Sequence, residues 1–429
     1  MKLRTVFCDD GGKIYDHPEL EMAGLDGPEP WPVGEADVVP VPRGTDFLML
    51  PERSPVGIDP RTGEPVVFDE WEGKPAQGAA VFMAPAYTQT MRPAYRTRKG
   101  APALPLFAYT ALGFAEGQLW AAGLRVDPDP RQDPWRFNMN RVQKRIGKRL
   151  QQMGHNRLVQ QLVRCALEYG CRAAQNFFLD RWEAPLPISI ACNAQCVGCI
   201  SLQSDGQFKA SHERLDVPPT PEEVAEVALG HVQRVKQAVV SFGQGCEGEP
   251  LLMDDLLEEC IRLVRNRTGD GTINLNTNGS LPEVVERLFR AGLDSIRVSL
   301  NSPRKELYDA YFKPRSYGLD AVFETLRIAR MYGKFTSINL FVFPGITDTE
   351  PELEALTSLI DEVKPNMIQM RNLNIDPEVY LGSLPSDALG PGFGIRETMD
   401  RLRKRFPRLQ FGYFNPPKER FAANRAPEW

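Results

Sequence analysis

From about residue 186 onward, short apolar stretches alternate with longer stretches in which apolar residues recur every three to four positions. The short stretches predict buried strands, and the longer ones predict amphipathic helices. The expected strands cover residues 186–191, 238–242, 272–276, 295–300, 336–343 and 366–371. Because strands that alternate with helices form a parallel sheet with the helices outside, the pattern predicts an α/β fold.

Helix starts between these strands carry a recognisable capping pattern. In a capping box, a hydroxyl residue and an acidic residue three positions later each accept a backbone N–H at the helix start. The candidate pairs are Thr220 with Glu223, Ser280 with Glu283 and Thr349 with Glu352. We therefore expect a helix to begin at each of these places.

Residues 1–133 follow a different pattern, in which short apolar runs such as DVVPV and DFLML are separated by stretches rich in proline and glycine. This pattern predicts a small strand-rich domain of unknown role. The most apolar stretch, residues 101–124, contains Pro102, Pro105, Glu116 and Gln118. We therefore expect it to be buried within the fold and not to span a membrane.

Residues 134–183 form a third region, which we expect to be a basic helical connector. Val142, Ile146 and Leu150 recur at a spacing of four and predict an apolar helix stripe. No Asp or Glu occurs from Pro134 to Leu167, so the opposite face is basic. The basic residues are Arg136, Arg141, Lys144, Arg145, Lys148, Arg149, Arg157 and Arg164.

Two interpretations of this basic face stay open. It is either a solvated surface or a docking surface for an acidic partner, such as a flavodoxin-type reductant, a phosphate-bearing substrate or RNA. The net charge of −5 argues against a general nucleic-acid binder, and few aromatic residues are interleaved for stacking on bases. Nucleic acid is therefore disfavoured without being excluded.

The strongest chemical signal is the segment from Ile188 to Ile200, ISIACNAQCVGCI, which contains Cys192, Cys196 and Cys199. Thiolates are the preferred ligands of iron-sulfur clusters, and a cubane needs four ligands, so three cysteines leave one iron open. Such an open position binds a cofactor or a substrate. A structural zinc site would need a fourth ligand, and His212 lies outside the usual spacing.

The Cys-x3-Cys-x2-Cys spacing after a first strand resembles the signature of the radical SAM superfamily, whose 4Fe-4S cluster binds S-adenosylmethionine (SAM). One departure is Gly198, where the superfamily usually has an aromatic residue. The resemblance covers about residues 184–374. Within the superfamily, this part of the chain resembles the molybdenum-cofactor cyclase and peptide-maturase branch. It implies an open (β/α)6 partial TIM barrel, with the site at the carboxyl ends of the strands.

Further residues are assigned as SAM contacts by the same resemblance. Gly248, Glu249 and Pro250 resemble the Gly-Glu-Pro motif that holds the amino group of the SAM methionine. At the ends of the third and fourth expected strands, the resemblance adds Asn276, Thr277, Asn278, Ser299 and Asn301, and more weakly Arg297. The alternative for the third strand end is a turn with a helix cap.

Two other residues are candidates for catalytic contacts with the substrate. Cys246 lies three residues before Glu249, where it would contact the substrate, donate hydrogen or only fill space in the core. Arg371, at the end of the sixth expected strand, would bind an anionic substrate or form an internal salt bridge. Cys8, Cys165, Cys171 and Cys246 have sequence positions that look unrelated, so we expect one cluster only.

The chain is thus expected to comprise residues 1–133, the connector 134–183, the partial barrel 184–375 and a C-terminal extension 376–429. The extension should contain a helix near residues 397–405 and a strand near 409–413. The start of the sequence lacks a secretory signal, and clustered cysteines fit a reducing compartment, so we expect a cytoplasmic protein.

The resemblance implies an oxidoreductase-type radical SAM enzyme. A flavodoxin or ferredoxin would supply one electron, SAM would be cleaved to a 5'-deoxyadenosyl radical, and hydrogen would be abstracted from an unidentified substrate. That substrate would be anionic if Arg371 binds it. SAM-dependent methyl transfer and a non-catalytic iron-sulfur carrier remain the alternatives.

Overall fold

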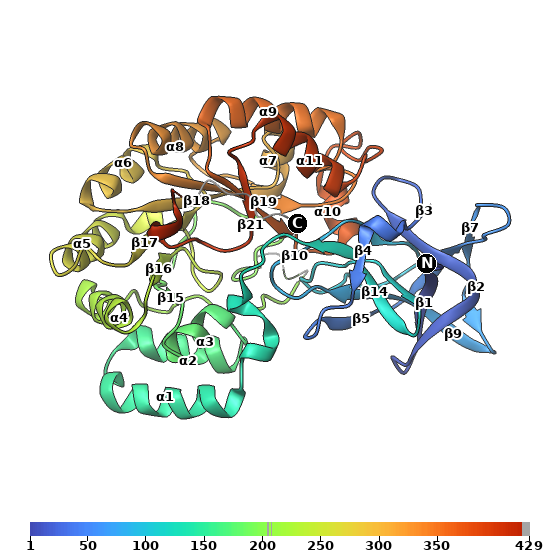
Figure 1. Ribbon diagram of the computed structural model, residues 1–429, viewed down its shortest axis with the longest axis horizontal. Helices are drawn as coiled ribbons and strands as arrows, with labels where there is room; N and C mark the ends of the chain where they lie inside the picture. Colours follow the sequence, from blue (N-terminus) through green and yellow to red (C-terminus); the bar gives the residue numbers. More distant parts are fainter. Residues whose placement is uncertain (204–205, 207, 423–429) are drawn as a thin grey trace. The chain divides into compact units, whose positions relative to one another are not determined.

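The computed structural model describes residues 1–203, 206 and 208–422 and divides the chain into two compact units (Figure 1). Unit 1 contains Met1–Pro128, Phe341–Thr357 and Met370–Pro407. Unit 2 contains Asp129–Leu340, Ser358–Gln369 and the chain from Arg408 on. Each unit is therefore assembled from segments that are distant in the sequence.

A seven-stranded sheet, with its strands in sequence order, carries the chemistry-bearing loops. Its strands pair in parallel between β15 and β19 and between β20 and β21. They are β15 (Glu183–Pro185), β16 (Val239–Phe242), β17 (Thr272–Thr277), β18 (Ser295–Leu300), β19 (Phe335–Val342), β20 (Met367–Asn372) and β21 (Gln410–Gly412). The predicted α/β partial barrel is confirmed, and the expected C-terminal strand adds β21 beside β20.

The first strand differs from the prediction. Pairing between β15 and β16 runs from Glu183 to Pro185, and the residues from Leu186 onward are not part of a strand. Pro187 has no backbone N–H to donate to a neighbouring strand, which explains why regular pairing stops before it. The chain therefore leaves the sheet early, several residues before the first cysteine of the site.

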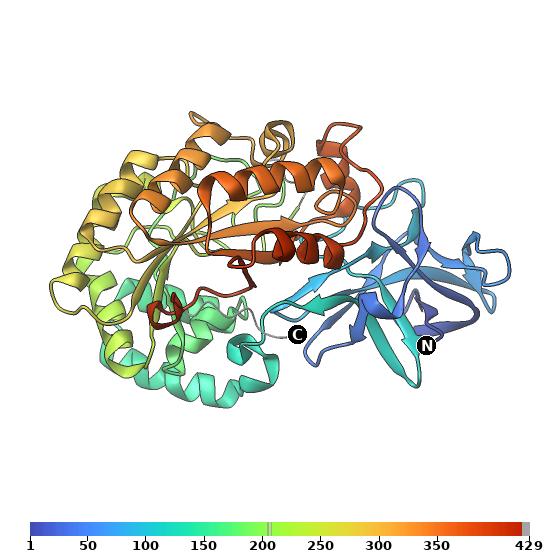
Figure 2. The same ribbon diagram turned by 45° about the horizontal axis from the view of Figure 1, so that its top comes forward.

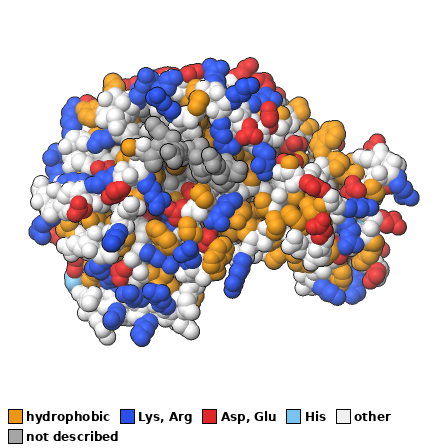
Figure 3. Space-filling view, viewed as in Figure 1, with side chains coloured by type: hydrophobic (Ala, Val, Ile, Leu, Met, Phe, Trp, Pro, Cys, Tyr) orange, Lys and Arg blue, Asp and Glu red, His pale blue; other side chains and the backbone are white. Residues whose placement is uncertain are grey.

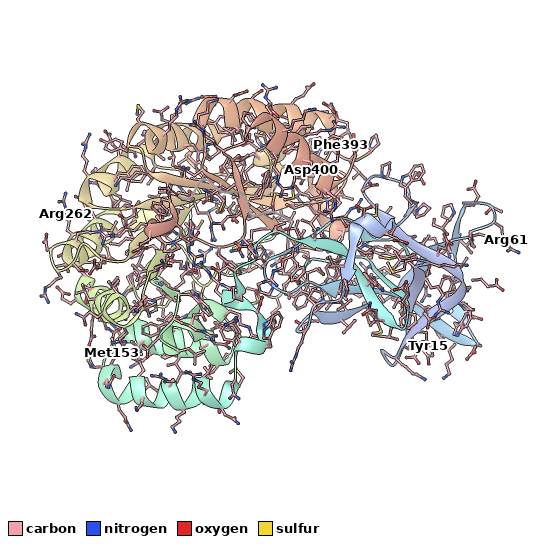
Figure 4. The ribbon with its side chains drawn as sticks, in the orientation of Figure 1. Tyr15, Arg61, Met153, Arg262, Phe393 and Asp400 are labelled. Carbon is pink, nitrogen blue, oxygen red and sulfur yellow. The ribbon has the colours of Figure 1, made fainter. Side chains whose placement is uncertain are left out.

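Helices α4, α5, α6 and α8 lie on the outer side of strands β15–β19 (Figures 1 and 2). Arg262 of α5 points away from the strands and pairs with Glu258 at 2.6 Å (Figure 4). These helices are α4 (Pro221–Arg234), α5 (Asp254–Arg265), α6 (Pro282–Ala291) and α8 (Leu319–Met331), and α7 (Lys305–Phe312) precedes α8. The connection after β18 thus contains two helices.

The capping predictions have mixed outcomes. At α4, Glu223 N donates to Thr220 Oγ1 (3.3 Å) and Thr220 N donates to Glu223 Oε2 (2.8 Å), so this capping box is confirmed. At α6 the prediction is wrong, because the N-cap residue is Leu281 and no side chain caps the helix. The Ser280 hydroxyl instead accepts a hydrogen bond from Asn193.

The basic connector folds into α1 (Met139–Met153), α2 (Arg157–Leu167) and α3 (Arg172–Phe178). Side chains of Lys and Arg gather over α1 (Figure 3). Part of this charge is neutralised within unit 2, because Arg145, Arg149 and Arg234 all pair with Asp180. Arg141, Lys144 and Lys148 are exposed, so both interpretations of the basic face stay open for these residues.

Unit 1 is built on antiparallel pairs, which confirms the predicted strand-rich N-terminal region. Its strands are β1 (Arg4–Asp9), β2 (Ile14–Leu25), β3 (Trp31–Pro32), β4 (Val38–Pro40), β5 (Asp46–Leu50), β6 (Arg53–Ile58), β7 (Pro65–Val67), β8 (Glu70–Trp71), β9 (Lys74–Phe82), β10 (Tyr87–Gln89), β11 (Arg92–Pro93), β12 (Tyr95–Thr97), β13 (Leu112–Ala115) and β14 (Gln118–Arg125). The apolar stretch 101–124 supplies β13 and most of β14. Within residues 1–203, 206 and 208–422, no helix combines the length and apolar character that crossing a bilayer requires.

Later parts of the chain complete unit 1. They contribute α10 (Pro377–Ser383), α11 (Ile395–Arg405) and the start of α9 (Glu350–Val363). Asp376, before α10, accepts hydrogen bonds from Arg53 Nη2 (3.3 Å) and Leu104 N (2.7 Å). Arg53 and Asp376 are each 1% exposed, so this ion pair fixes the C-terminal segment to the strands in a buried position.

Replacing Asp376 with Ala should lower the free energy of unfolding by about 3 kcal/mol, because Arg53 would remain as a buried charge without its partner. The matched control is Glu378→Ala, since Glu378 also lies 3.5 Å from Arg53 but is 46% exposed. The control should lose less than about 1 kcal/mol. Thermal unfolding measures both variants, and equal losses would contradict the role given to the buried pair.

Candidate functional site

The three cysteines of the predicted cluster site lie on one loop after β15. Cys192, Cys196 and Cys199 are all half-buried. Burial, and to a smaller extent the neighbouring Glu249 carboxylate, raise the pKa of the Cys192 thiol to about 11. Burial also holds the pKa of Cys196 well above its usual range, with added effects from Cys199 and Cys192. Neighbouring sulfurs therefore act on Cys192 and Cys196, and a bound cation would favour the thiolate forms of these two residues.

The chemistry of this donor set fits an iron-sulfur cluster. Cys199 Sγ accepts from Arg214 Nη2 (3.8 Å) and lies 3.6 Å from Ser201 Oγ, so a cation and a hydroxyl are close to the sulfur. Among the described residues, no three His, Cys, Asp or Glu side chains are arranged to hold one metal ion. In a cubane each thiolate binds a different iron, so the cluster does not require such an arrangement.

The loop from Gly243 to Pro250 packs directly on the cysteine loop. Gly248 N donates to Ser189 O (2.9 Å), and Glu249 N donates to Ala191 O (2.7 Å). A Cβ atom on Gly248 would lie 1.9 Å from Ala191 O, so no other residue allows this approach. The predicted Gly-Glu-Pro residues and the predicted cluster ligands are thus brought together.

Glu249 is the central carboxylate of this arrangement. Its Oε1 accepts from Thr277 Oγ1 (2.6 Å) and Leu251 N (3.1 Å), and its Oε2 accepts from Asn278 N (2.7 Å). The residue is 4% exposed. Burial raises its pKa to about 7, although the three hydrogen bonds act in the opposite direction. A cationic ligand group would therefore relieve a buried negative charge.

The asparagines at the end of β17 have different partners. Asn278 Nδ2 donates to Asn193 Oδ1 (2.8 Å), which connects the strand end to the segment between Cys192 and Cys196. Asn276 Nδ2 donates to Phe242 O (2.8 Å), so its side chain joins β17 to β16. Asn278 thus positions the cysteine loop, whereas Asn276 belongs to the interior of the sheet.

The predicted SAM contacts Ser299 and Asn301, on β18 and directly after it, have different surroundings. Ser299 Oγ accepts from Asn339 Nδ2 (3.2 Å) on the neighbouring strand and is half-buried. Asn301 is 1% exposed and donates to Leu307 O (2.9 Å), so it holds the start of α7. Arg297, two residues before Ser299 on β18, donates to Gln369 Oε1 (3.3 Å) on β20.

The two candidates for substrate contacts have different surroundings. Arg371 is half-buried at the end of β20, in a segment that belongs to unit 1. Cys246 is 5% exposed, and the neighbouring thiols of Cys165 on α2 and of Cys171 act with burial to raise its pKa. The expectation that these three cysteines are unrelated is therefore wrong. The cause is a helix break, since Gly170 adopts a φ of 63° and Cys171 N donates to Cys165 O (2.9 Å).

Sequence reasoning missed Glu247, which joins the two loops of the site. Its Oε2 accepts from Ile188 N (2.8 Å) and Ser189 N (3.0 Å), and its Oε1 accepts from Gln244 N (2.7 Å). Burial raises its pKa to about 7. The available signal was Pro187, because a strand that stops early leaves the next backbone N–H groups in need of an acceptor.

The part of the chain that carries this site is similar to known proteins. The family model for the radical SAM superfamily matches residues 186–356. A probable GTP 3',8-cyclase from Thermococcus kodakarensis is 32% identical over 183 residues, covering 40% of this chain and 52% of that protein. The FeMo cofactor biosynthesis protein NifB from Klebsiella pneumoniae is 28% identical over 181 residues, covering 38% of each. The alignments thus span about half or less of these curated relatives.

Among solved structures, Streptococcus suis SuiB bound to S-adenosylmethionine is 16% identical and aligns over 57% of this chain and 55% of that chain. The TM-score is 0.39, and no inference is drawn from a similarity at that level. The family match and the curated relatives confirm the predicted radical SAM domain and its relation to the molybdenum-cofactor cyclases.

Replacing Glu247 with Gln should loosen the start of the cysteine loop, because the amide has one acceptor oxygen for three backbone N–H groups that now bind two carboxylate oxygens. Hydrogen exchange in a peptide covering residues 186–199 should become faster. Glu259→Gln, on the exposed face of α5, is the matched control and should leave this exchange unchanged. Unchanged exchange in Glu247→Gln would contradict the assigned role.

Proposed function

Because the chain contains a radical SAM domain, whose family cofactors are a 4Fe-4S cluster and SAM, we propose that it is an enzyme that cleaves SAM reductively. When bound, the cluster supplies the electron for this cleavage, and the resulting 5'-deoxyadenosyl radical abstracts hydrogen from a substrate. The observation that supports the proposal is the direct hydrogen bonding between the cysteine loop and the Gly-Glu-Pro loop. This contact brings the proposed cluster ligands and Glu249 into one site.

The residues of this chain have distinct roles in the proposal. Cys192, Cys196 and Cys199 would hold the cluster, and three protein ligands leave the fourth iron of a cubane open to another ligand. Glu249 accepts the ammonium group of the SAM methionine in a charge-assisted hydrogen bond. Thr277 fixes the orientation of this carboxylate by donating to Oε1. Glu249 is thus held in place before the ligand arrives.

Other residues contribute by position. Gly248 permits the close approach of the two loops, and Asn278 holds both Glu249 and the cysteine loop through Asn193. Ser299 is half-buried on β18 and offers a hydroxyl to SAM or the substrate. Asn301 holds the backbone at the start of α7, and Asn276 holds the backbone at the end of β16. Both would therefore position the site without contacting SAM. Cys246 serves the packing of the loop against α2.

Anaerobic reconstitution should give about four irons per chain, and reduction in the presence of SAM should release 5'-deoxyadenosine. Cys196→Ala should lose both properties because it removes a cluster ligand. The matched control is Cys171→Ala, a half-buried cysteine outside the loop, which should keep both. Chromatography of the products decides the outcome. S-adenosylhomocysteine would indicate methyl transfer, and neither product would indicate a carrier.

Glu249→Gln should weaken SAM binding, because an amide attracts an ammonium group less strongly than a carboxylate does. Burial raises the pKa of Glu249 to about 7, so the ionised form that binds SAM increases as the pH rises. Wild-type affinity, measured by equilibrium dialysis, should therefore increase several-fold from about pH 6 to about pH 8. The variant should lack this increase.

Glu283→Gln, on an exposed position of α6, is the control and should behave like the wild type. Equal SAM affinity in wild type and Glu249→Gln would remove Glu249 from the proposed site.

A further inference from the structure

The end of α7 supports the cysteine loop through the backbone. Gln195 N donates to Phe312 O (2.9 Å), and Val197 N donates to Tyr311 O (2.9 Å). In the opposite direction, Arg315 N donates to Asn193 O (2.7 Å). The segment that follows α7 therefore runs beside the loop that contains Cys196, like a neighbouring strand.

Two tyrosines flank this supporting segment. Tyr308, on α7, donates a hydrogen bond through its hydroxyl to the hydroxyl of Tyr317 (3.1 Å). The Tyr308 ring is stacked on Phe312, with 4.5 Å between ring centroids. Tyr308 is fully buried, whereas Tyr317 is half-buried. Tyr308 is thus fixed on the inside, and Tyr317 is held by it on the more open side.

Backbone contacts place these phenols beside the proposed cofactor site, because Arg315, two residues before Tyr317, donates to Asn193 O, and Pro314 forms a bridge with Ala194. Burial raises the pKa of both hydroxyls far above the usual value, and the charges of Cys196 and Glu249 act on both in the same direction. Cys196 is a proposed cluster ligand, and Glu249 is the proposed acceptor for SAM. The tyrosine pair therefore lies on the segment that the backbone hydrogen bonds hold against the cysteine loop.

The backbone between the two tyrosines has an unusual conformation that fixes this placement. Lys313 has a φ of 44° and Ser316 has a φ of 64°, which are left-handed values in residues other than glycine. Such residues persist where the surrounding structure holds them, and they concentrate at functional sites. They turn the chain at the end of α7 so that it passes the cysteine loop and brings Tyr317 back to Tyr308.

We propose that Tyr317 is a further cofactor-site residue, whose ring covers the cluster against water, and that Tyr308 is the positioning residue that holds this ring. The inference rests on the proposed function, because it assumes a cluster on Cys196. It assigns a role to α7, which is the additional helix in the connection after β18. Cover of this kind controls water access to a metal centre and thereby its reduction potential.

The test uses the full chain, reconstituted anaerobically with its cluster. In Tyr317→Leu, iron should pass to the chelator ferrozine several-fold faster than in the wild type. The cluster should also have a less negative reduction potential, measured by redox titration with EPR detection, because water stabilises the added negative charge. Tyr317→Phe keeps the ring but loses the hydrogen bond between the two hydroxyls, so its iron loss should lie between those of the wild type and Tyr317→Leu.

Two further variants complete the design. Tyr308→Phe keeps both rings but loses the hydroxyl that donates to Tyr317, so its iron loss should lie between those of the wild type and Tyr317→Leu. Tyr332→Leu is the matched control, since this tyrosine donates to Glu286 (2.8 Å) on α6 and should leave iron loss and potential unchanged.

The possible failures are distinct. A wild-type chain that takes up no cluster would overturn the proposed function itself. A wild-type chain that holds its cluster, with iron loss and potential unchanged in Tyr317→Leu, would overturn only the role of Tyr317. If Tyr317→Leu does not fold, Tyr308→Phe decides: faster iron loss supports the proposal, and wild-type behaviour contradicts it.

Discussion

The structure of the site depends on two backbone hydrogen bonds, from Gly248 N to Ser189 O and from Glu249 N to Ala191 O. They join the loop that carries three cysteines to the loop that carries the buried carboxylate. Only glycine at position 248 leaves room for them. Two groups that are about fifty residues apart in the sequence thereby become parts of one site, and the surrounding contacts of Thr277 and Asn278 depend on that arrangement.

Two carboxylates in this loop have different roles, although burial raises the pKa of both to about 7. Glu247 uses both oxygens on backbone N–H groups of its own and the neighbouring loop, so it is structural. Glu249 is held by Thr277 and by backbone groups at the edge of the proposed cofactor site. The assignment of function to Glu249 alone therefore follows from their partners, because their charge and burial are alike.

Much of the fold could be predicted because a parallel sheet imposes a regular pattern of apolar strands, and β16 to β20 lie where that pattern indicated. The position of β15 could not be predicted, because the effect of Pro187 depends on how the chain pairs with the neighbouring strand β16. The position of Cys171 beside Cys165 depends on a helix break at Gly170, and the tyrosine pair lies more than a hundred residues from the cysteines. Such long-range contacts leave no periodic pattern in the sequence. The cluster ligands and the Gly-Glu-Pro residues could be predicted from the sequence, because each motif lies within a few consecutive residues.

The central claim is that three sulfurs on one loop hold a cluster whose remaining iron binds SAM beside Glu249. The most direct measurement is the EPR spectrum of the reduced, anaerobically reconstituted protein with and without SAM. We expect a cubane signal whose g-values and line shape change when SAM is added, because the ligand enters the coordination sphere of one iron. A signal that is identical with and without SAM, or a preparation that contains zinc and no cluster, would contradict the account.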